Sequence, residues 1–291
     1  MDGRLKRGIC KTAAAAVLCL CMFQADRSAA APAAPPRGLS TIEVPALPQG
    51  SVDRRTIPVD VYMPVSGRHA GDVLVLPGWK FPRREWQSKS PIISEAERLG
   101  FRCVFPEMNT TLYESSYYPE TEMKWSAMPG GRWIRERLLP ALREIGLFRN
   151  GGKNFVMGLS TGGRGAVLVT LQNPGVFRAA AALSGDFDQS AMPRDRLMTS
   201  VYGPFRKFRD RWEGADNPQK NIGRWNVPLY LGHGKKDEVV PFSQSESFYS
   251  ALKKMHPALN IVFNAPEDAG HDFNYWSSEV KPVMDFFASI H

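Results

Sequence analysis

The sequence predicts an α/β fold with a mainly parallel central sheet, helices on both faces and a small lid excursion after the sixth strand. Short apolar runs bounded by turn residues alternate with helix-like segments, which is typical of repeated βαβ units. One run leads into Gly158-Leu159-Ser160-Thr161-Gly162, directly before a helix-like segment. The chain has 291 residues, enough for one large domain with a full core.

The first 31 residues have the pattern of a secretory signal peptide. A basic stretch within the first eleven residues precedes an apolar run at residues 12–23, which is too short to span a bilayer comfortably. Ser28-Ala29-Ala30-Ala31 supplies the small residues that signal peptidase prefers. We therefore predict a periplasmic or secreted protein without stable membrane insertion after signal removal; an uncleaved anchor or a misassigned start codon is the alternative.

Residues 32–50 are rich in Ala and Pro, and we expect a linker or an extended arm there. A catalytic domain is predicted at residues 51–291. Three of the four cysteines lie in the predicted signal peptide, so the mature chain would keep only Cys103. A single cysteine cannot form an internal disulfide, and its apolar neighbours indicate a buried core residue.

The charge of the chain argues against nucleic acid as a partner. Residues 1–31 contribute +3 of the total of +8, so the predicted mature protein carries about +5. That surplus is small and dispersed along the sequence, whereas nucleic-acid binding needs concentrated basic surface.

The strands and helices can be assigned in chain order. The first strand alternates apolar and polar residues, which indicates an antiparallel edge strand, and the later ones are short apolar runs typical of buried strands. We predict strands at residues 56–63, 72–76, 101–105, 154–157, 178–183, 228–231 and 260–264. We predict helices at residues 90–99, 133–145, 163–171, 242–255 and 278–290. Pro140 is expected to kink or split the second helix.

Two segments interrupt this alternation. Residues 186–226 form the predicted lid excursion, where Phe205, Phe208 and Trp212 fall on one face of an expected amphipathic helix. Residues 106–130 form a long loop after a strand end.

Ser160 has the setting of a catalytic nucleophile. A serine on a sharp strand-to-helix turn is held in a strained conformation with its hydroxyl exposed. It needs a base because a serine hydroxyl is a weak nucleophile at neutral pH. Asp237 and His271 follow later strand ends, which gives the chain order Ser, Asp, His of such triads. Asp186 and Asp188 are rival acids, and His233 is expected to shape its own loop.

The oxyanion formed during ester cleavage needs two N–H donors. The N–H of Thr161, directly after the nucleophile, is one candidate. The turn after residues 72–76 offers the N–H of Trp79 as the other.

No cofactor or metal is expected. The sequence has no paired His or Cys residues at the spacing of metal ligands. The glycine-rich turn at Ser160 lacks the lysine of a phosphate loop and the full dinucleotide pattern.

These motifs resemble the α/β-hydrolase superfamily, and within it the esterase branch that includes esterase D, the feruloyl esterases and the antigen 85 mycolyltransferases. The resemblance covers roughly residues 70 to 290 and implies the triad Ser160, Asp237 and His271. Thr161 departs from the pattern, since many relatives carry Met there. The matching segments are Gly158 to Ala166, Pro174 to Phe177, Ala182 to Gly185, Tyr202 to Pro204, Arg211-Trp212, Asn217-Pro218, His233 to Asp237 and Gly270 to Phe273.

The sequence therefore predicts a secreted serine hydrolase that cleaves carboxylic esters through an acyl-enzyme, with a small-molecule or glycan-linked ester as substrate. Glu107, Tyr117, Tyr118 and Trp125 in the long loop are candidate substrate-binding residues, although the aromatic side chains could instead pack that loop against its neighbours.

Three alternatives remain. One is an acyltransferase that hands the acyl group to an alcohol. Another is a peptidase of the prolyl-oligopeptidase type; these usually carry an N-terminal propeller, for which the stretch before residue 70 is too short. The third, from a different class, is a non-catalytic binding protein on a hydrolase scaffold, although binding alone would not need all three triad residues.

Overall fold

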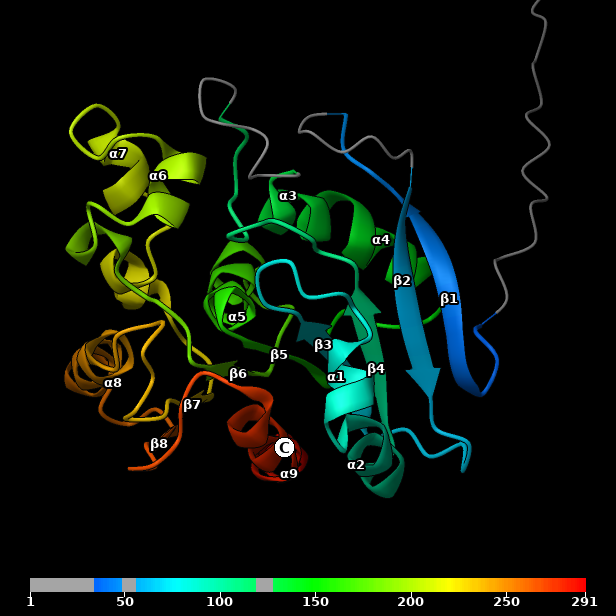
Figure 1. Ribbon diagram of the computed structural model, residues 1–291. Helices are drawn as coiled ribbons and strands as arrows, with labels where there is room; N and C mark the ends of the chain where they lie inside the picture. Colours follow the sequence, from blue (N-terminus) through cyan, green and yellow to red (C-terminus); the bar gives the residue numbers. More distant parts are fainter. Residues whose placement is uncertain (1–33, 49–55, 119–127) are drawn as a thin grey trace, which may run out of the picture. The chain divides into compact units, whose positions relative to one another are not determined.

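A mixed sheet, with eight strands among the described residues, forms the centre of the protein in the order β1-β2-β4-β3-β5-β6-β7-β8 (Figure 1). The computed structural model describes residues 34–48, 56–118 and 128–291. The predicted signal peptide therefore lies outside the described residues. The strands are β1 (Gly38–Pro45), β2 (Thr56–Met63), β3 (Gly71–Leu76), β4 (Phe101–Pro106), β5 (Asn154–Leu159), β6 (Ala179–Leu183), β7 (Leu229–Gly232) and β8 (Ile261–Asn264).

The sheet is parallel from β4 to β8, and only the β1–β2 and β2–β4 pairs are antiparallel. The predicted α/β-hydrolase fold is confirmed. The prediction that residues 56–63 form an edge strand is wrong, because β2 pairs with β4 on one side and with β1 on the other. β1 lies within the stretch expected to be a linker or arm, and the Ala/Pro-rich composition around it concealed a strand that alternates half-buried and exposed residues.

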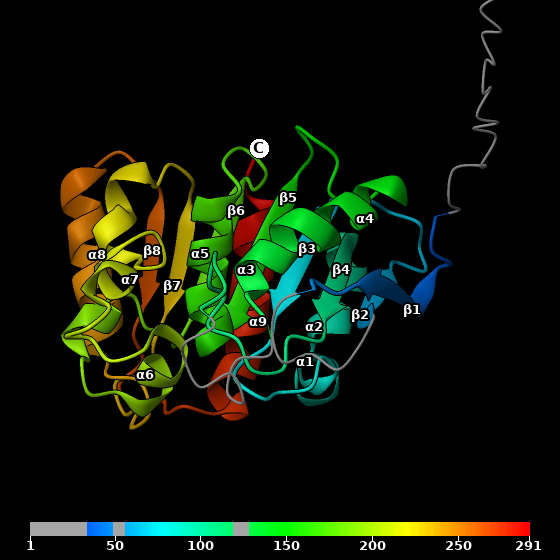
Figure 2. The ribbon, with the colours of Figure 1, turned by 90° about the horizontal axis from the view of Figure 1, so that it is seen from above.

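Helices cover both faces of the sheet (Figures 1 and 2). One core layer joins the sheet to α4, α5 and α8, and the other joins it to α1, α2 and α9. The helices are α1 (Glu85–Lys89), α2 (Ile92–Leu99), α3 (Gly130–Trp133), α4 (Leu139–Glu144), α5 (Thr161–Gln172), α6 (Arg196–Tyr202), α7 (Arg209–Glu213), α8 (Ser243–Met255) and α9 (Phe273–Ala288). None of the helices within the described residues is long and apolar enough for a bilayer crossing.

The period-2 geometry of strands divides their side chains between the two layers. In β5, Val156 packs into the first layer, and Phe155 and Met157 pack into the second. All six residues of β5 are buried, as expected for a strand with helices on both sides. This central strand fixes the position of the turn that follows it.

Pro140 coincides with a change in the helix that contains it. A π-helical turn, Ile134–Leu138, separates α3 from α4, and Pro140 lies at the start of α4. Proline has no N–H to donate and crowds the preceding turn, and the π-helical turn lies just before it. The chain stays helical from Gly130 to Glu144, so the helix changes type near Pro140 but is not split in two.

The excursion after β6 differs in part from the sequence expectation. The helix expected around residues 205–212 begins only at Arg209, and a turn in which the N–H of Phe208 donates to Pro204 O precedes it. The apolar packing is as predicted, because Trp212 is buried and the ring centroid of Phe205 lies 5.5 Å from that of Trp212.

The last helix is longer than predicted. α9 begins at Phe273 rather than at residue 278. Asp272 caps it by accepting hydrogen bonds from the N–H groups of Asn274 and Tyr275, the usual role of aspartate at a helix N-terminus. The cap places the preceding residue, His271, at a fixed point where the chain enters the helix.

Candidate active site

Ser160 occupies a strained turn between β5 and α5. Its φ of 54° and ψ of −125° lie in a region that non-glycine residues rarely adopt. The turn is possible only because glycines surround it: a Cβ on Gly158 would lie 2.2 Å from Gly162 O, and one on Gly162 would lie 2.5 Å from Leu76 O. The Ser160 N–H is held by Leu183 O at 2.8 Å, and its side chain is left partly exposed.

The structure brings the three predicted triad residues together. His271 Nε2 lies 3.0 Å from Ser160 Oγ, and His271 Nδ1 lies 2.7 Å from Asp237 Oδ2. The carboxylate accepts a hydrogen bond from Nδ1–H, and this leaves Nε2 without a hydrogen and able to accept the proton of the serine hydroxyl. Three residues from three strand ends thus form one hydrogen-bonded chain.

The Asp237 side chain is inaccessible to solvent, yet it is held in its charged form. Burial alone would raise the pKa of Asp237, but hydrogen bonds from His233, from His271 and from the backbone N–H of Val240 outweigh it and hold the pKa below its ordinary value. The side chain has no exposed area. A carboxylate that stays ionised can orient the imidazole and stabilise its cation.

A cluster of three aromatic side chains, Trp276, Phe81 and Phe273, packs beside His271. The Trp276 ring meets the imidazole edge-on, with centroids 4.9 Å apart, and Trp276 Nε1 donates to Ser184 Oγ at 3.1 Å. Phe81 and Phe273 pack against Trp276 in turn. Because Phe81 follows the predicted oxyanion turn and Trp276 belongs to α9, this group links the two sides of the site.

The predicted oxyanion turn lies against the nucleophile. A Cβ on Gly78 would lie 3.4 Å from Ser160 Cβ, so Pro77-Gly78-Trp79 passes directly beside the serine. Two rings fix this turn, since Trp86 Nε1 donates to Leu76 O and Tyr113 Oη donates to Pro77 O. Within the described residues, the N–H of Trp79 has no acceptor.

Thr161 directly follows Ser160 in the chain. It is the first residue of α5, where an N–H has no intrahelical partner. Its hydroxyl Oγ1 is buried without a hydrogen-bond partner in the described part of the chain. The N–H groups of Thr161 and Trp79 therefore stay the candidate donors for an oxyanion at Ser160.

The rival acids lie in other contacts. Asp186 is buried against Arg164, with Oδ2 2.7 Å from Nη1. Asp188 Oδ1 accepts hydrogen bonds from the N–H of Ser190 and from Asn217 Nδ2. Neither carboxylate has a recorded contact with His271 among the described residues.

Two of the four candidate substrate-binding residues, Glu107 and Tyr118, make contacts with residues other than the triad. Glu107 Oε2 accepts from the backbone N–H and Nη1 of Arg83, at 3.3 and 3.4 Å, so it belongs to an ion-pair group. Tyr118 packs on Tyr202 and donates to Asp216, which joins the long loop to the excursion. Tyr117 is half-buried, and Trp125 lies outside the described residues.

Two contacts of the site were not foreseen from the sequence. His233 lies 3.2 Å from Asp237 Oδ2 through its Nε2. The Arg164 guanidinium, one turn after the nucleophile, is fully buried among residues of the excursion. Both residues stand within motifs used for the resemblance, but no spacing rule assigned them partners.

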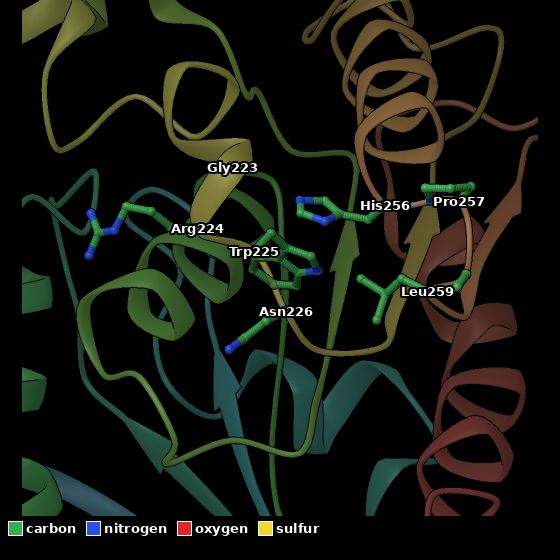
Figure 3. Close-up of a pocket in the computed structure, with 8 residues that line it drawn as sticks. Gly223, Arg224, Trp225, Asn226, His256, Pro257 and Leu259 are labelled. Carbon is green, nitrogen blue, oxygen red and sulfur yellow. The ribbon is translucent and has the colours of Figure 1, made fainter.

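Surface hollows elsewhere do not involve the triad. One, of about 510 Å³, lies between the segment that precedes β7 and the end of α8, where Trp225, His256 and Leu259 surround it (Figure 3). Another, of about 400 Å³, borders Gly270 and Tyr275. In the described part of the chain, no group of three or more His, Cys, Asp or Glu side chains is arranged to hold a metal ion.

Comparison with known proteins assigns the family. A family model described as "Prolyl oligopeptidase family" matches residues 140–290, just over half of the chain. The chain belongs to the prolyl oligopeptidase family. The matched region contains Ser160, Asp237 and His271. The predicted resemblance to the α/β-hydrolases is thereby confirmed.

The chain is similar to a curated protein and to several solved structures. The diacylglycerol acyltransferase/mycolyltransferase Ag85A of Mycobacterium tuberculosis is 22% identical over 235 residues, which span 68% of this chain and 66% of that protein. The chain thus matches slightly less than two thirds of the relative's length.

Among solved structures, the S-formylglutathione hydrolase from Agrobacterium tumefaciens aligns with a TM-score of 0.68 at 15% identity, over 87% of this chain and 95% of that one. The Mycobacterium tuberculosis protein MPT51 aligns with a TM-score of 0.70 at 16% identity, over 88% and 99%. The acylaminoacyl peptidase of Pyrococcus horikoshii aligns with a TM-score of 0.63 at 15% identity, over 87% of this chain but 41% of that one. At these identities the likeness is one of fold.

Proposed function

We propose that this chain is a serine hydrolase that cleaves carboxylic esters through an acyl-enzyme on Ser160. The observation that carries the proposal is the hydrogen-bonded chain from Ser160 Oγ through His271 to Asp237. Family membership and the esterases among the structural neighbours support the same class of reaction. Residues 1–31 act as a signal peptide in this proposal, and residues 51–291 carry the catalytic site.

The mechanism follows from the placement of each group. Ser160 Oγ attacks the ester carbonyl carbon while His271 Nε2 takes the hydroxyl proton. The tetrahedral oxyanion accepts hydrogen bonds from the N–H groups of Thr161 and Trp79. His271 then returns the proton to the leaving alcohol as the ester C–O bond breaks, and Asp237 stabilises the imidazolium between the two transfers.

The acyl-enzyme is resolved by the same groups in reverse. Water enters the position of the departed alcohol, and His271 takes one of its protons as the water oxygen attacks the acyl carbon. The second tetrahedral intermediate collapses, the carboxylic acid leaves, and the proton returns to Ser160 Oγ. We propose a small-molecule or glycan-linked ester as the substrate, reached in the periplasm or outside the cell.

A fluorophosphonate probe tests the nucleophile directly. We expect the probe to label the protein covalently, because an activated serine attacks phosphorus as it attacks a carbonyl carbon. Mass spectrometry of the digested protein should locate the adduct on the peptide that contains Ser160. The absence of labelling, or an adduct on another peptide, would remove the basis of the proposal.

Two relatives suggest other fates for the acyl group. The Ag85A match favours transfer to an alcohol, and the family and the acylaminoacyl peptidase fold favour amide substrates. We expect p-nitrophenyl esters of graded chain length, feruloyl esters and acetylated sugars to include substrates, with faster turnover than a p-nitroanilide of the same acyl group. Products should be free acids even with added alcohol; dominant ester exchange would identify an acyltransferase.

A further inference from the structure

His233 is a buried histidine that contacts Asp237 but takes no part in the proposed proton transfers. It directly follows β7 and has no exposed area. Its Nδ1 lies 2.7 Å from Ser245 Oγ in α8, and its Nε2 lies 3.0 Å from Val240 O and 3.2 Å from Asp237 Oδ2. A buried imidazole with polar contacts at both nitrogens is held in one orientation.

The partners of His233 determine where its proton lies. Val240 O is a carbonyl and Asp237 Oδ2 belongs to an ionised carboxylate, so both can only accept hydrogen bonds. Nε2 must therefore carry the hydrogen that faces them. Ser245 Oγ can donate to Nδ1, so a single ring hydrogen at Nε2 is enough to satisfy these contacts.

The carboxylate of Asp237 is held by donors on both oxygens. Oδ1 accepts from the backbone N–H groups of Val239 and Val240, at 2.9 and 2.8 Å. Oδ2 accepts from His271 Nδ1 at 2.7 Å and faces His233 Nε2 at 3.2 Å. Without His233, Oδ2 would be fixed only by His271, the residue whose position it has to fix.

We propose that His233 is a positioning residue of the triad, which holds Asp237 Oδ2 in place for His271 and closes the 237–240 turn through Val240 O. The inference deepens the proposed function and rests on it. His233 touches neither the substrate nor the reacting atoms, so its effect on rate passes through Asp237. The contact between His233 Nε2–H and Asp237 Oδ2 also favours the ionised form of the Asp237 carboxylate. An ionised Asp237 leaves the Nδ1 proton on His271.

Two variants separate the hydrogen bond from the packing. His233→Phe keeps a planar ring beside Phe242, whose centroid is 5.8 Å away, but removes both nitrogens. We expect it to lower kcat by about 10- to 100-fold with little change in KM, the range for a lost hydrogen bond to a charged group. His233→Gln keeps an N–H near the Nε2 position and should recover most of the rate.

A double-mutant cycle tests the route of the effect. If His233 acts through Asp237, His233→Phe should lower kcat much less in an Asp237→Asn background than in the wild type. Should His233→Phe fail to fold, Ser245→Ala, which removes only the hydroxyl facing Nδ1, enters the same cycle. His256→Phe is the matched control, because His256 Nε2 donates to Ile222 O and His256 lines the hollow of Figure 3, whose lining includes no triad residue.

Circular dichroism and thermal unfolding establish that each variant is folded before rates are compared. Equal losses of kcat in both backgrounds, or a lowered Tm with unchanged kcat, would overturn the positioning role. A wild-type protein that hydrolyses no ester and takes up no fluorophosphonate would instead contradict the proposed function itself.

Discussion

Replacing Ser160 with alanine is expected to lower kcat for ester hydrolysis by about 10⁶-fold, because members of a serine triad act as a unit. Alanine and serine have similar backbone preferences, so the substitution should neither relieve nor increase the strain of this turn. We therefore expect the fold to change little. The proposed oxyanion donors, the N–H groups of Thr161 and Trp79, would remain, and we expect them to account for residual activity over water. Initial rates with the best p-nitrophenyl ester measure the effect.

Ser184→Ala is the matched control for this experiment. Ser184 also follows a parallel strand with a positive φ, of 50°, and is buried. Its hydroxyl accepts from Trp276 Nε1 rather than facing a histidine. The loss of one neutral hydrogen bond should lower kcat by less than about 10-fold. A Ser160→Ala protein that kept more than about a hundredth of the wild-type kcat would place the nucleophile elsewhere, on the scale of triad deletions.

The second large effect concerns stability. We expect Arg164→Met to lower the free energy of unfolding by about 3–5 kcal/mol, because it leaves a buried carboxylate without its cation. Arg164 has no exposed area, and its Nη1 donates to Asp186 Oδ2 at 2.7 Å and to Gln189 Oε1 at 3.1 Å. Its Nη2 donates to Tyr202 Oη and to Asp216 O.

These contacts connect α5, the helix that follows Ser160, to the excursion at residues 186–226. The N–H of Arg164 donates to Ser160 O, so the same residue continues the turn that carries the nucleophile. Burial raises the pKa of Asp186, while the guanidinium opposes that rise. Removal of the guanidinium would therefore leave Asp186 either buried and charged or protonated, and both states cost stability.

Urea denaturation followed by tryptophan fluorescence measures the change. Arg178→Met is a suitable control, since Arg178 is exposed and its side chain makes one hydrogen bond within the described residues, to Gly151 O. Surface changes of this kind stay within about 0.5 kcal/mol. Arg164→Met combined with Asp186→Asn should be less damaging than Arg164→Met alone. Equal losses at Arg164 and Arg178 would show that the buried network contributes no more than a surface contact.

Most of the sheet was predictable because its strands are continuous apolar runs between turn residues. All seven predicted strands are present, and their ends differ from the prediction by at most two residues. β1 was missed because its partner is β2, and an exposed edge strand has little hydrophobic signal of its own. The helix predicted around residues 205–212 was shortened by Gly203-Pro204 before it and by the Phe208 turn, which tertiary packing on Trp212 stabilises.

For some residues of the candidate site the sequence predicted both position and partner, and for others it predicted position only. Ser160, Asp237 and His271 could be named because each follows a strand in a fixed chain order, and parallel strands present their carboxyl ends at one edge. Glu107 satisfied the same rule of position, yet the structure pairs it with Arg83. Position after a strand end indicates where a residue lies but does not identify its partner.

The sequence by itself determined the strained serine turn, the order of the triad and the alternation that builds the sheet, because these depend on local residue types and on short-range periodicity. Only the tertiary structure decided that His233 faces Asp237, that Arg164 holds the excursion and that Trp276 supports His271. Trp276 lies close to His271 in the sequence and contacts its ring. Trp276 also packs on Phe81, which belongs to a segment far away in the chain. Such contacts follow from the order of strands in the sheet and the packing of helices upon it, which residue spacing alone does not specify.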